Sequence, residues 1–195
     1  EPAAVAWQQA VGVDLATGTG DIAFTAVRQS PSVTVVGADF SMPMMRVGRS
    51  RAQGHRVHWC QTDALALPYP ANTFDAVVSG YLLRNVIDLP RCLAEQVRVT
   101  RPGGMVVALD TTPPPHNALR PFLLFHLRYV IPLLGRAVAG AADAYEYLPS
   151  STQSFKEPEE LSDLMAGAGL VDVRYRTFMF GTMAVHWGQK PPAAA

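Results

Sequence analysis

Short apolar runs alternate with amphipathic segments along the first 110 residues of the chain. Each run has the length of a buried strand, and each amphipathic segment repeats its apolar residues at helical spacing. The predicted strands are 11–15, 33–39, 55–60, 74–80 and 105–110, and the predicted helices are 21–29, about 41–53 and 88–100. Strands that alternate with helices form parallel sheets, so the pattern predicts a Rossmann-like, doubly wound α/β fold.

The pattern changes after Asp110. Three prolines, Pro113–Pro115, precede a long apolar stretch, Leu119–Val138, which we interpret as two short covering helices. A helix over about 157–167 then leads to a closing pair of strands at 171–178 and 182–187. These strands complete a mostly parallel, seven-stranded sheet with an antiparallel C-terminal strand and a helical cover insertion.

This organisation predicts one domain over residues 1–195. Its expected parts are a cofactor-binding half over 11–112, a helical substrate cover over 113–150, and a closing helix and strands over 151–190.

Composition and charge narrow the classes of function. The chain of 195 residues has 16 basic and 16 acidic side chains, so no net charge attracts nucleic acid. Cys60 and Cys92 lie far apart without metal-ligand spacing, and we expect two free thiols and no metal site. The sequence shows no signal peptide and no apolar run of about 20 residues. We therefore expect a cytoplasmic protein with at most weak peripheral membrane contact.

The first predicted strand runs through Asp14 into a glycine-rich turn. A strand, a tight glycine turn and a helix N-terminus together bind nucleotide-like ligands. Gly18 and Gly20 carry no side chain that would obstruct a ligand against the backbone. The spacing Gly18-x-Gly20-x-x-Ala23, with Asp39 about 20 residues on, also fits the dinucleotide fingerprint. The loop alone therefore does not separate NAD from S-adenosylmethionine.

Three features favour S-adenosylmethionine. Asp14 is placed to face the ammonium group of the methionine moiety, where a pyrophosphate would be repelled. Asp63 and Ala64 follow the third strand, where they can read the amino edge of adenine. No lysine precedes Lys156, so the Tyr-x-x-x-Lys dyad of hydride transfer cannot exist in the sheet region. The predicted cofactor contacts are Asp14, Thr17, Gly18, Thr19, Gly20, Asp21, Asp39, Phe40, Asp63, Ala64, Ser79 and Gly80.

Each of these carboxylates also has a structural interpretation. Asp39 and Asp63 are the kind of residue that caps a strand end. Asp21 is placed to interact with the dipole of the following helix. Their gathering around one glycine loop favours the cofactor interpretation.

Several motifs of the chain resemble those of the ubiquinone/menaquinone biosynthesis C-methyltransferases. They are Asp14–Asp21, Gly37–Asp39, Leu67–Pro70, Leu83–Val86, Arg98–Gly104, Ile131–Gly135, Ala144–Pro149 and Ala184–His186. The similarity covers roughly residues 11–190, and Leu-Arg-Asn-Val with Tyr-x-Tyr-Leu-Pro is its most specific part. Asp110 stands where the family has Glu, and Gly80 where it has Ser. The resemblance implies methylation, by S-adenosylmethionine, of a ring carbon of a prenylated quinol such as demethylmenaquinol.

Such a reaction needs a proton acceptor or a phenolate stabiliser, because the ring carbon becomes nucleophilic when the adjacent hydroxyl loses its proton. Arg84 stays protonated, so we assign it phenolate stabilisation with an ordered water as relay; the alternative is a structural ion pair. Asn85 either orients the ring hydroxyl or caps a turn. His186 is the best placed conventional base, with a packed core residue as its alternative. Tyr145 and Tyr147 either line the quinone pocket or pack a helix.

Two other functions stay open from the sequence. One is methyl transfer to another small apolar acceptor on the same fold. The other is a non-catalytic fold member in a quinone-biosynthesis assembly. Three interpretations of the apolar stretch 121–134 also stay open: it forms the mouth of a tunnel for the prenyl tail, it touches the membrane surface, or it packs on the core. The oligomeric state is open, with a homodimer among the options.

Overall fold

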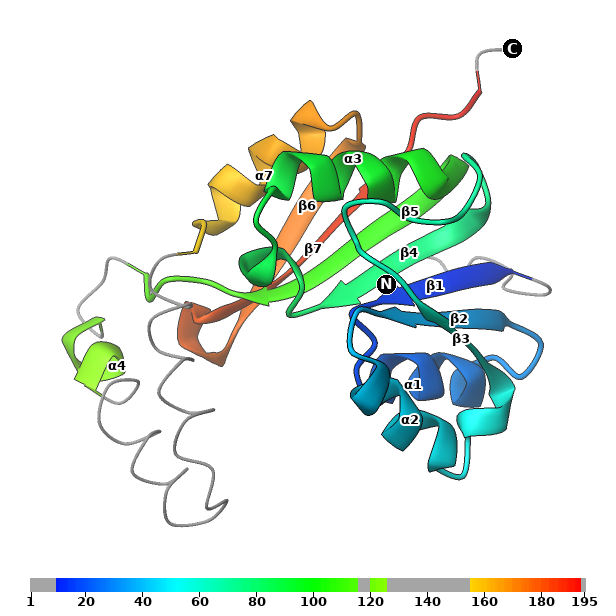
Figure 1. Ribbon diagram of the computed structural model, residues 1–195. Helices are drawn as coiled ribbons and strands as arrows, with labels where there is room; N and C mark the ends of the chain where they lie inside the picture. Colours follow the sequence, from blue (N-terminus) through cyan, green and yellow to red (C-terminus); the bar gives the residue numbers. More distant parts are fainter. Residues whose placement is uncertain (1–9, 116–119, 126–154, 194–195) are drawn as a thin grey trace.

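One seven-stranded sheet organises the protein. The computed structural model describes residues 10–115, 120–125 and 155–193. The sheet has the order β3-β2-β1-β4-β5-β7-β6 (Figure 1). Its strands are β1 (Val11–Leu15), β2 (Thr34–Asp39), β3 (Val57–Gln61), β4 (Phe74–Gly80), β5 (Thr100–Thr111), β6 (Val171–Phe178) and β7 (Met183–Gln189). β7 is antiparallel to both of its neighbours, and the other neighbouring pairs are parallel, which confirms the predicted fold class.

Helices cover the two faces of this sheet. In Figure 1, α1 and α2 lie below the strands and α3 and α7 lie above them. The described helices are α1 (Asp21–Gln29), α2 (Met42–Ser50), α3 (Leu89–Val99), α4 (Arg120–Phe125) and α7 (Pro158–Gly167), with 3₁₀ turns η1 (Gly54–Arg56), η2 (Leu83–Asn85) and η4 (Met179–Gly181). Among the described residues, no helix has both the length and the apolar character needed to cross a membrane.

The start of β5 differs from its prediction. The sequence indicates a turn over 101–104 and a strand from Met105, but the structure begins β5 at Thr100. The register passes from Phe74 opposite Thr100 to Ala76 opposite Met105, so residues 101–104 form a bulge. Gly103, at φ +79, donates its N–H to the carbonyl of Lys190 at 2.9 Å, which links the bulge to the residue after β7.

Most of the predicted cover lies outside the described residues. Of the stretch 119–138, only α4 is described, as one short helix. Tyr145, Tyr147 and the motifs 131–135 and 144–149 also lie outside the described residues.

The strand order places the ligand crevice. The chain turns back from β3 to β4, which lies beside β1, so the connections that follow β1 and β4 leave toward opposite faces. Ligands of open α/β sheets bind at this switch point, beyond the carboxyl ends of the strands. The predicted cofactor residues come from the ends of β1 to β4 and therefore meet at one edge of the sheet.

Candidate active site

Asp14 organises the glycine loop from inside the protein. Its side chain is 2% exposed. Its Oδ2 accepts hydrogen bonds from Thr17 Oγ1 at 2.6 Å and from the N–H of Ala23 at 3.1 Å, which ties β1 to the loop and to α1. Its Oδ1 is buried without a hydrogen-bond partner among the described residues. Burial raises the pKa of this carboxyl to about 6, against a lowering by its bonds to Thr17 and Ala23.

Asp39, at the end of β2, holds the loop from the other side. Its Oδ2 accepts the N–H of Gly18 at 2.7 Å, and its Oδ1 accepts the N–H of Ser41 at 2.7 Å. Gly18 and Gly20 take φ values of +56 and +92, the left-handed region that favours glycine. A Cβ at Gly20 would lie 2.8 Å from the ring of Trp59, so the turn has no room for a side chain there.

A small cavity opens where β1 to β4 end. Its volume is about 90 Å³, and it is lined by Leu15, Ala16, Ala38, Asp39, Phe40, Thr62, Ala64 and Leu82. Phe40, one of the lining residues, is 77% exposed, and the lining is apolar apart from Asp39 and Thr62. Asp63 lies next to this cavity and accepts the N–H of Leu65 at 2.8 Å, so its carboxylate also shapes the turn after β3.

Asp21 and Thr19 lie on the solvent side of the loop. The Asp21 side chain is 75% exposed and pairs with Arg51 at 2.8 Å. Arg51 also donates to the carbonyl of Thr19 at 3.1 Å. Asp21 is the first residue of α1, where its negative charge interacts favourably with the helix dipole. This is the structural interpretation that the sequence analysis gave for it.

Ser79 and Gly80 end β4 beside β1. Ser79 is 1% exposed, and its Oγ has no hydrogen-bond partner among the described residues. A Cβ on Gly80 would lie 2.8 Å from Cδ1 of Ile22, so a serine at this position would have to displace that side chain.

Arg84 and Asp110 form a buried ion pair at the carboxyl ends of β4 and β5. Arg84 Nη1 lies 2.6 Å from Asp110 Oδ1, and the two side chains are 8% and 2% exposed. Asp110 also accepts the N–H groups of Arg84 and Thr111. The Arg84 guanidinium lies over the ring of Tyr81 at 4.7 Å, while its Nε is buried without a partner among the described residues.

Sequence reasoning missed Tyr81 and did not name Asp110 as the partner of Arg84. Tyr81 has φ +58, an uncommon conformation for a residue with a large side chain. The only available signal was position, since Tyr81 follows the end of β4 and Asp110 lies near the end of β5.

Asn85 and His186 occupy different surroundings. Asn85 is exposed and donates Nδ2 to the carbonyl of Tyr81 at 2.7 Å, which closes the turn η2. His186 is 1% exposed in β7, with Nε2 at 2.9 Å from the carbonyl of Pro158 and its ring stacked on Tyr175. Burial lowers the pKa of His186. The structure therefore places His186 in the packed core position that was the alternative to a base.

The sheet and its flanking helices form the Rossmann-like fold that also occurs in solved structures of methyltransferases. The chain superposes with a TM-score of 0.70 on Haemonchus contortus phosphoethanolamine N-methyltransferase 2 in complex with S-adenosyl-L-methionine, at 15% identity, covering 94% of this chain and 49% of that one. A Thermotoga maritima S-adenosylmethionine-dependent methyltransferase gives a TM-score of 0.64 at 20% identity, covering 93% and 82% of the two chains.

Sequence comparison specifies the family. The chain belongs to the ubiE/COQ5 methyltransferase family, which matches residues 4–190. It is 52% identical to the ubiquinone/menaquinone biosynthesis C-methyltransferase UbiE of Desulfotalea psychrophila, covering 91% of this chain and 72% of the relative. It is 42% identical to the demethylmenaquinone methyltransferase of Thermus thermophilus, covering 92% and 82%.

Proposed function

We propose that this chain transfers the methyl group of S-adenosylmethionine to a ring carbon of a prenylated quinol of the demethylmenaquinol type. Family membership and the names of the relatives support a C-methyltransferase of quinone biosynthesis. The buried Arg84–Asp110 pair is the observation that supports the proposed acceptor site. It lies at the ends of β4 and β5, and β4 is the neighbour of β1, which leads into the glycine loop.

The donor lies along the ends of β1 to β4 in this proposal. S-adenosylmethionine supplies a methyl group on a positively charged sulfur. Asp39 accepts hydrogen bonds from the ribose hydroxyls, and the ring of Phe40 covers the adenine. Asp63 and Ala64 read the adenine amino edge. The unpartnered Oδ1 of Asp14 is the carboxylate oxygen that remains for the ammonium group, either directly or through a water.

Thr17, Thr19, Ser79 and Gly80 complete the donor side. Thr17 fixes the Asp14 carboxylate through its hydroxyl. Thr19 and Gly80 border the methionine chain with their backbone, and the Ser79 hydroxyl supplies a donor that has no acceptor among the described residues.

The acceptor ring lies against Arg84. Its permanently charged guanidinium stabilises the phenolate that forms when the ring hydroxyl loses its proton. Asp110 orients the guanidinium through Nη1, which leaves the buried Nε as the donor for a ring oxygen or for a relaying water. An unsatisfied buried donor costs free energy, so this contact is favourable when the acceptor binds. Asn85 orients the same hydroxyl from η2.

His186 takes no part in this proposal. A base has to come within hydrogen-bond distance of the proton that it removes, and a ring that is 1% exposed would first have to leave the core. Its contact with the Pro158 carbonyl instead fixes the start of α7 against β7.

A turnover assay tests the proposal. The full chain is incubated with methyl-labelled S-adenosylmethionine and a short-chain demethylmenaquinol, in reduced and in oxidised form. We expect label in the reduced ring only, because only the quinol can form the phenolate. Arg84→Met should retain donor binding and lose at least about a hundredfold in turnover. Methylation of neither form by the unmodified protein would refute the proposal.

A further inference from the structure

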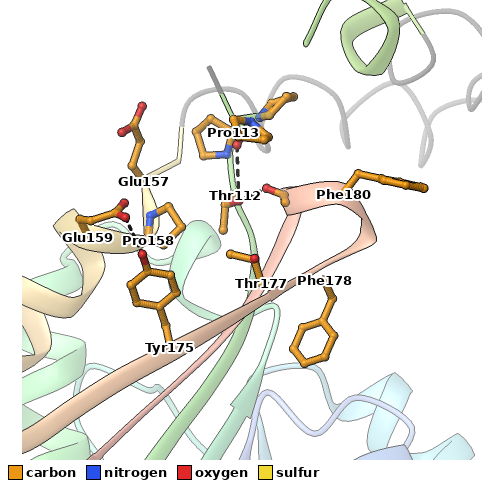
Figure 2. A pocket seen from close by; sticks show the side chains of 12 residues that line it. Thr112, Pro113, Glu157, Pro158, Glu159, Tyr175, Thr177, Phe178 and Phe180 are labelled. Atoms are coloured by element: carbon orange, nitrogen blue, oxygen red, sulfur yellow. Dashed lines mark hydrogen bonds between the residues drawn. The ribbon is translucent and has the colours of Figure 1, made fainter. Parts of the chain in front are cut away.

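A second, larger cavity lies beyond the end of β5. Its volume is about 640 Å³, within the range of about 300–1,000 Å³ that is typical of small-molecule sites. Figure 2 shows its walls, which come from the segment after β5, the start of α7 and the β6–β7 hairpin. None of the donor residues lines this cavity.

Most of the charged and polar side chains of the cavity already have partners within the protein. The hydroxyl of Tyr175 donates to Glu159, as the dashed line in Figure 2 shows. The Glu157 carboxylate accepts a backbone N–H in the capping box of α7. Thr112 donates its hydroxyl to the carbonyl of Gly181 at 2.7 Å. Each of the two carboxylates at the rim therefore has a hydrogen-bond partner within the protein.

What remains is an apolar wall. It consists of Pro113, Pro114, Pro115, Pro158 and Phe180, beside the ring of Tyr175. Phe180 is 75% exposed at the tip of the hairpin, with φ +57. An exposed aromatic next to four prolines is a surface that an apolar ligand would remove from water.

The wall is also fixed in place. A Cβ on Gly181 would lie 2.9 Å from Pro115, so the hairpin turn and the proline segment fit closely together. The backbone N–H of Thr112 donates to the carbonyl of Thr182 at 3.0 Å and adds a second link between them. Prolines have little conformational freedom to lose, so binding here orders few side chains.

The position of the cavity relates it to the acceptor. Thr112 lines it and lies two residues after Asp110, the partner of Arg84. The carboxylate that holds Arg84 and the first residue of this cavity therefore both lie at the carboxyl end of β5.

We infer that the proline and aromatic cavity binds the apolar chain of the methyl acceptor, so that this cavity selects acceptors by the size of their hydrocarbon substituent. The inference rests on the proposed function for the identity of the acceptor. Residues 112–115, 158 and 175–181 thus recognise the hydrocarbon chain of the acceptor, and they are separate from the residues that contact its ring.

Filling the cavity tests this assignment. Thr177 lies on β6 between the walls in Figure 2, and Thr177→Trp adds a large side chain there. We compare kcat/KM for a demethylquinol with a two-isoprene chain and for the same ring without a chain. The ratio of the two values should fall by about tenfold or more in Thr177→Trp. Phe180→Ala, which removes an exposed side chain and carries little risk to folding, should lower the same ratio several-fold.

Arg174→Trp is the control, because it places the same indole side chain at an exposed position of β6 that does not line the cavity. Its ratio should equal that of the unmodified protein. Equal losses for both acceptors in Thr177→Trp, or unchanged ratios in both cavity variants, would overturn the inference.

A binding measurement separates this inference from the proposed function. Calorimetric titration of the full chain with a short prenyl alcohol should show binding that Thr177→Trp abolishes and Arg174→Trp retains. If the protein methylates neither acceptor but this pattern holds, the proposed function fails and the cavity assignment stands. If the unmodified protein does not bind the alcohol, the cavity assignment fails.

Discussion

The glycine loop after β1 and the ends of β4 and β5 lie along the same edge of the sheet, but they hold their charged groups differently. On the donor side, Asp14 and Asp39 accept hydrogen bonds from backbone N–H groups and one hydroxyl of nearby segments. On the acceptor side, Arg84 and Asp110 form an ion pair in which both charges are buried. In the proposed function, the donor side therefore binds through the shape of a turn, whereas the acceptor side depends on a balance of two charges.

This difference has consequences for specificity. A loop held by carboxylates and glycines suits any ligand of nucleoside shape, which is why the glycine spacing alone fits two cofactors. The acceptor end is assembled from residues distant in sequence, such as Arg84 with Asp110 and Thr112 with Gly181. The acceptor can therefore change through substitutions in these contacts while the donor loop stays the same.

The largest effect is expected from breaking the buried charge pair. Arg84→Ala leaves the Asp110 carboxylate buried without its cation, which should lower the free energy of unfolding by about 3–5 kcal/mol. Urea denaturation measures this. Arg101→Ala is the control, because its pair with Asp75 is much more exposed, at 45% and 34%, and should contribute less than about 1 kcal/mol. The double variant R84A/D110A should recover part of the loss; a fully additive loss would contradict the proposed coupling.

The next effect concerns the donor loop. Asp39→Ala removes the acceptor of the Gly18 and Ser41 N–H groups, so we expect a stability loss of about 1–3 kcal/mol and no melting shift with S-adenosylhomocysteine. Asp88→Ala is the matched control. It removes the N-cap of α3, at a cost of about 1 kcal/mol, but lies outside the donor cavity. A melting shift that survives in Asp39→Ala would remove Asp39 from the donor site.

Asp14 gives a pH-dependent test. Its pKa in the folded protein is about 6, above the ordinary value of 3.8. The ligand-free protein should therefore lose stability through this group as the pH rises from 3.8 to 6, and this loss should be complete above pH 6. Donor binding should change in the opposite direction, because only the ionised carboxylate attracts an ammonium group. We expect affinity for S-adenosylhomocysteine, measured by calorimetry, to weaken as pH falls through 6. In Asp14→Asn the affinity should be low and lack this pH dependence; the same profile in both proteins would exclude Asp14.

The donor side was largely predictable from the sequence, since its elements are local. The strand, the glycine turn and α1 follow one another between Val11 and Gln29, and periodicity with turn chemistry determines each of them. Spacing also predicted the seven-stranded sheet and its reversed C-terminal strand. The bulge at 101–104 was missed because the pairing of β5 with β4 and Lys190 is not visible in the strand itself.

The acceptor side was less predictable, because its geometry depends on long-range contacts. Arg84 and His186 were both identified as candidates, yet nothing in their neighbourhoods showed that Asp110 would pair with one and that Pro158 and Tyr175 would enclose the other. The left-handed backbone conformation at Tyr81 could not be predicted, because the residue there is not a glycine. The large cavity likewise joins segments more than 60 residues apart, as the bond from Thr112 to Gly181 shows.

The smallest effect is expected at Asp21, and it tests where the donor side ends. The Asp21 side chain is 75% exposed, and its pair with Arg51 is a surface ion pair. Asp21→Asn keeps the shape and removes the charge, so the loss of stability should stay below about 0.5 kcal/mol, most of it from the dipole of α1. Added salt should reduce this loss further, because exposed charges are screened. If the melting shift with S-adenosylhomocysteine is unchanged, Asp21 belongs to the helix start, and the donor carboxylates are those bonded to the loop backbone. A shift that falls with this variant would extend the donor site to the exposed side of the loop.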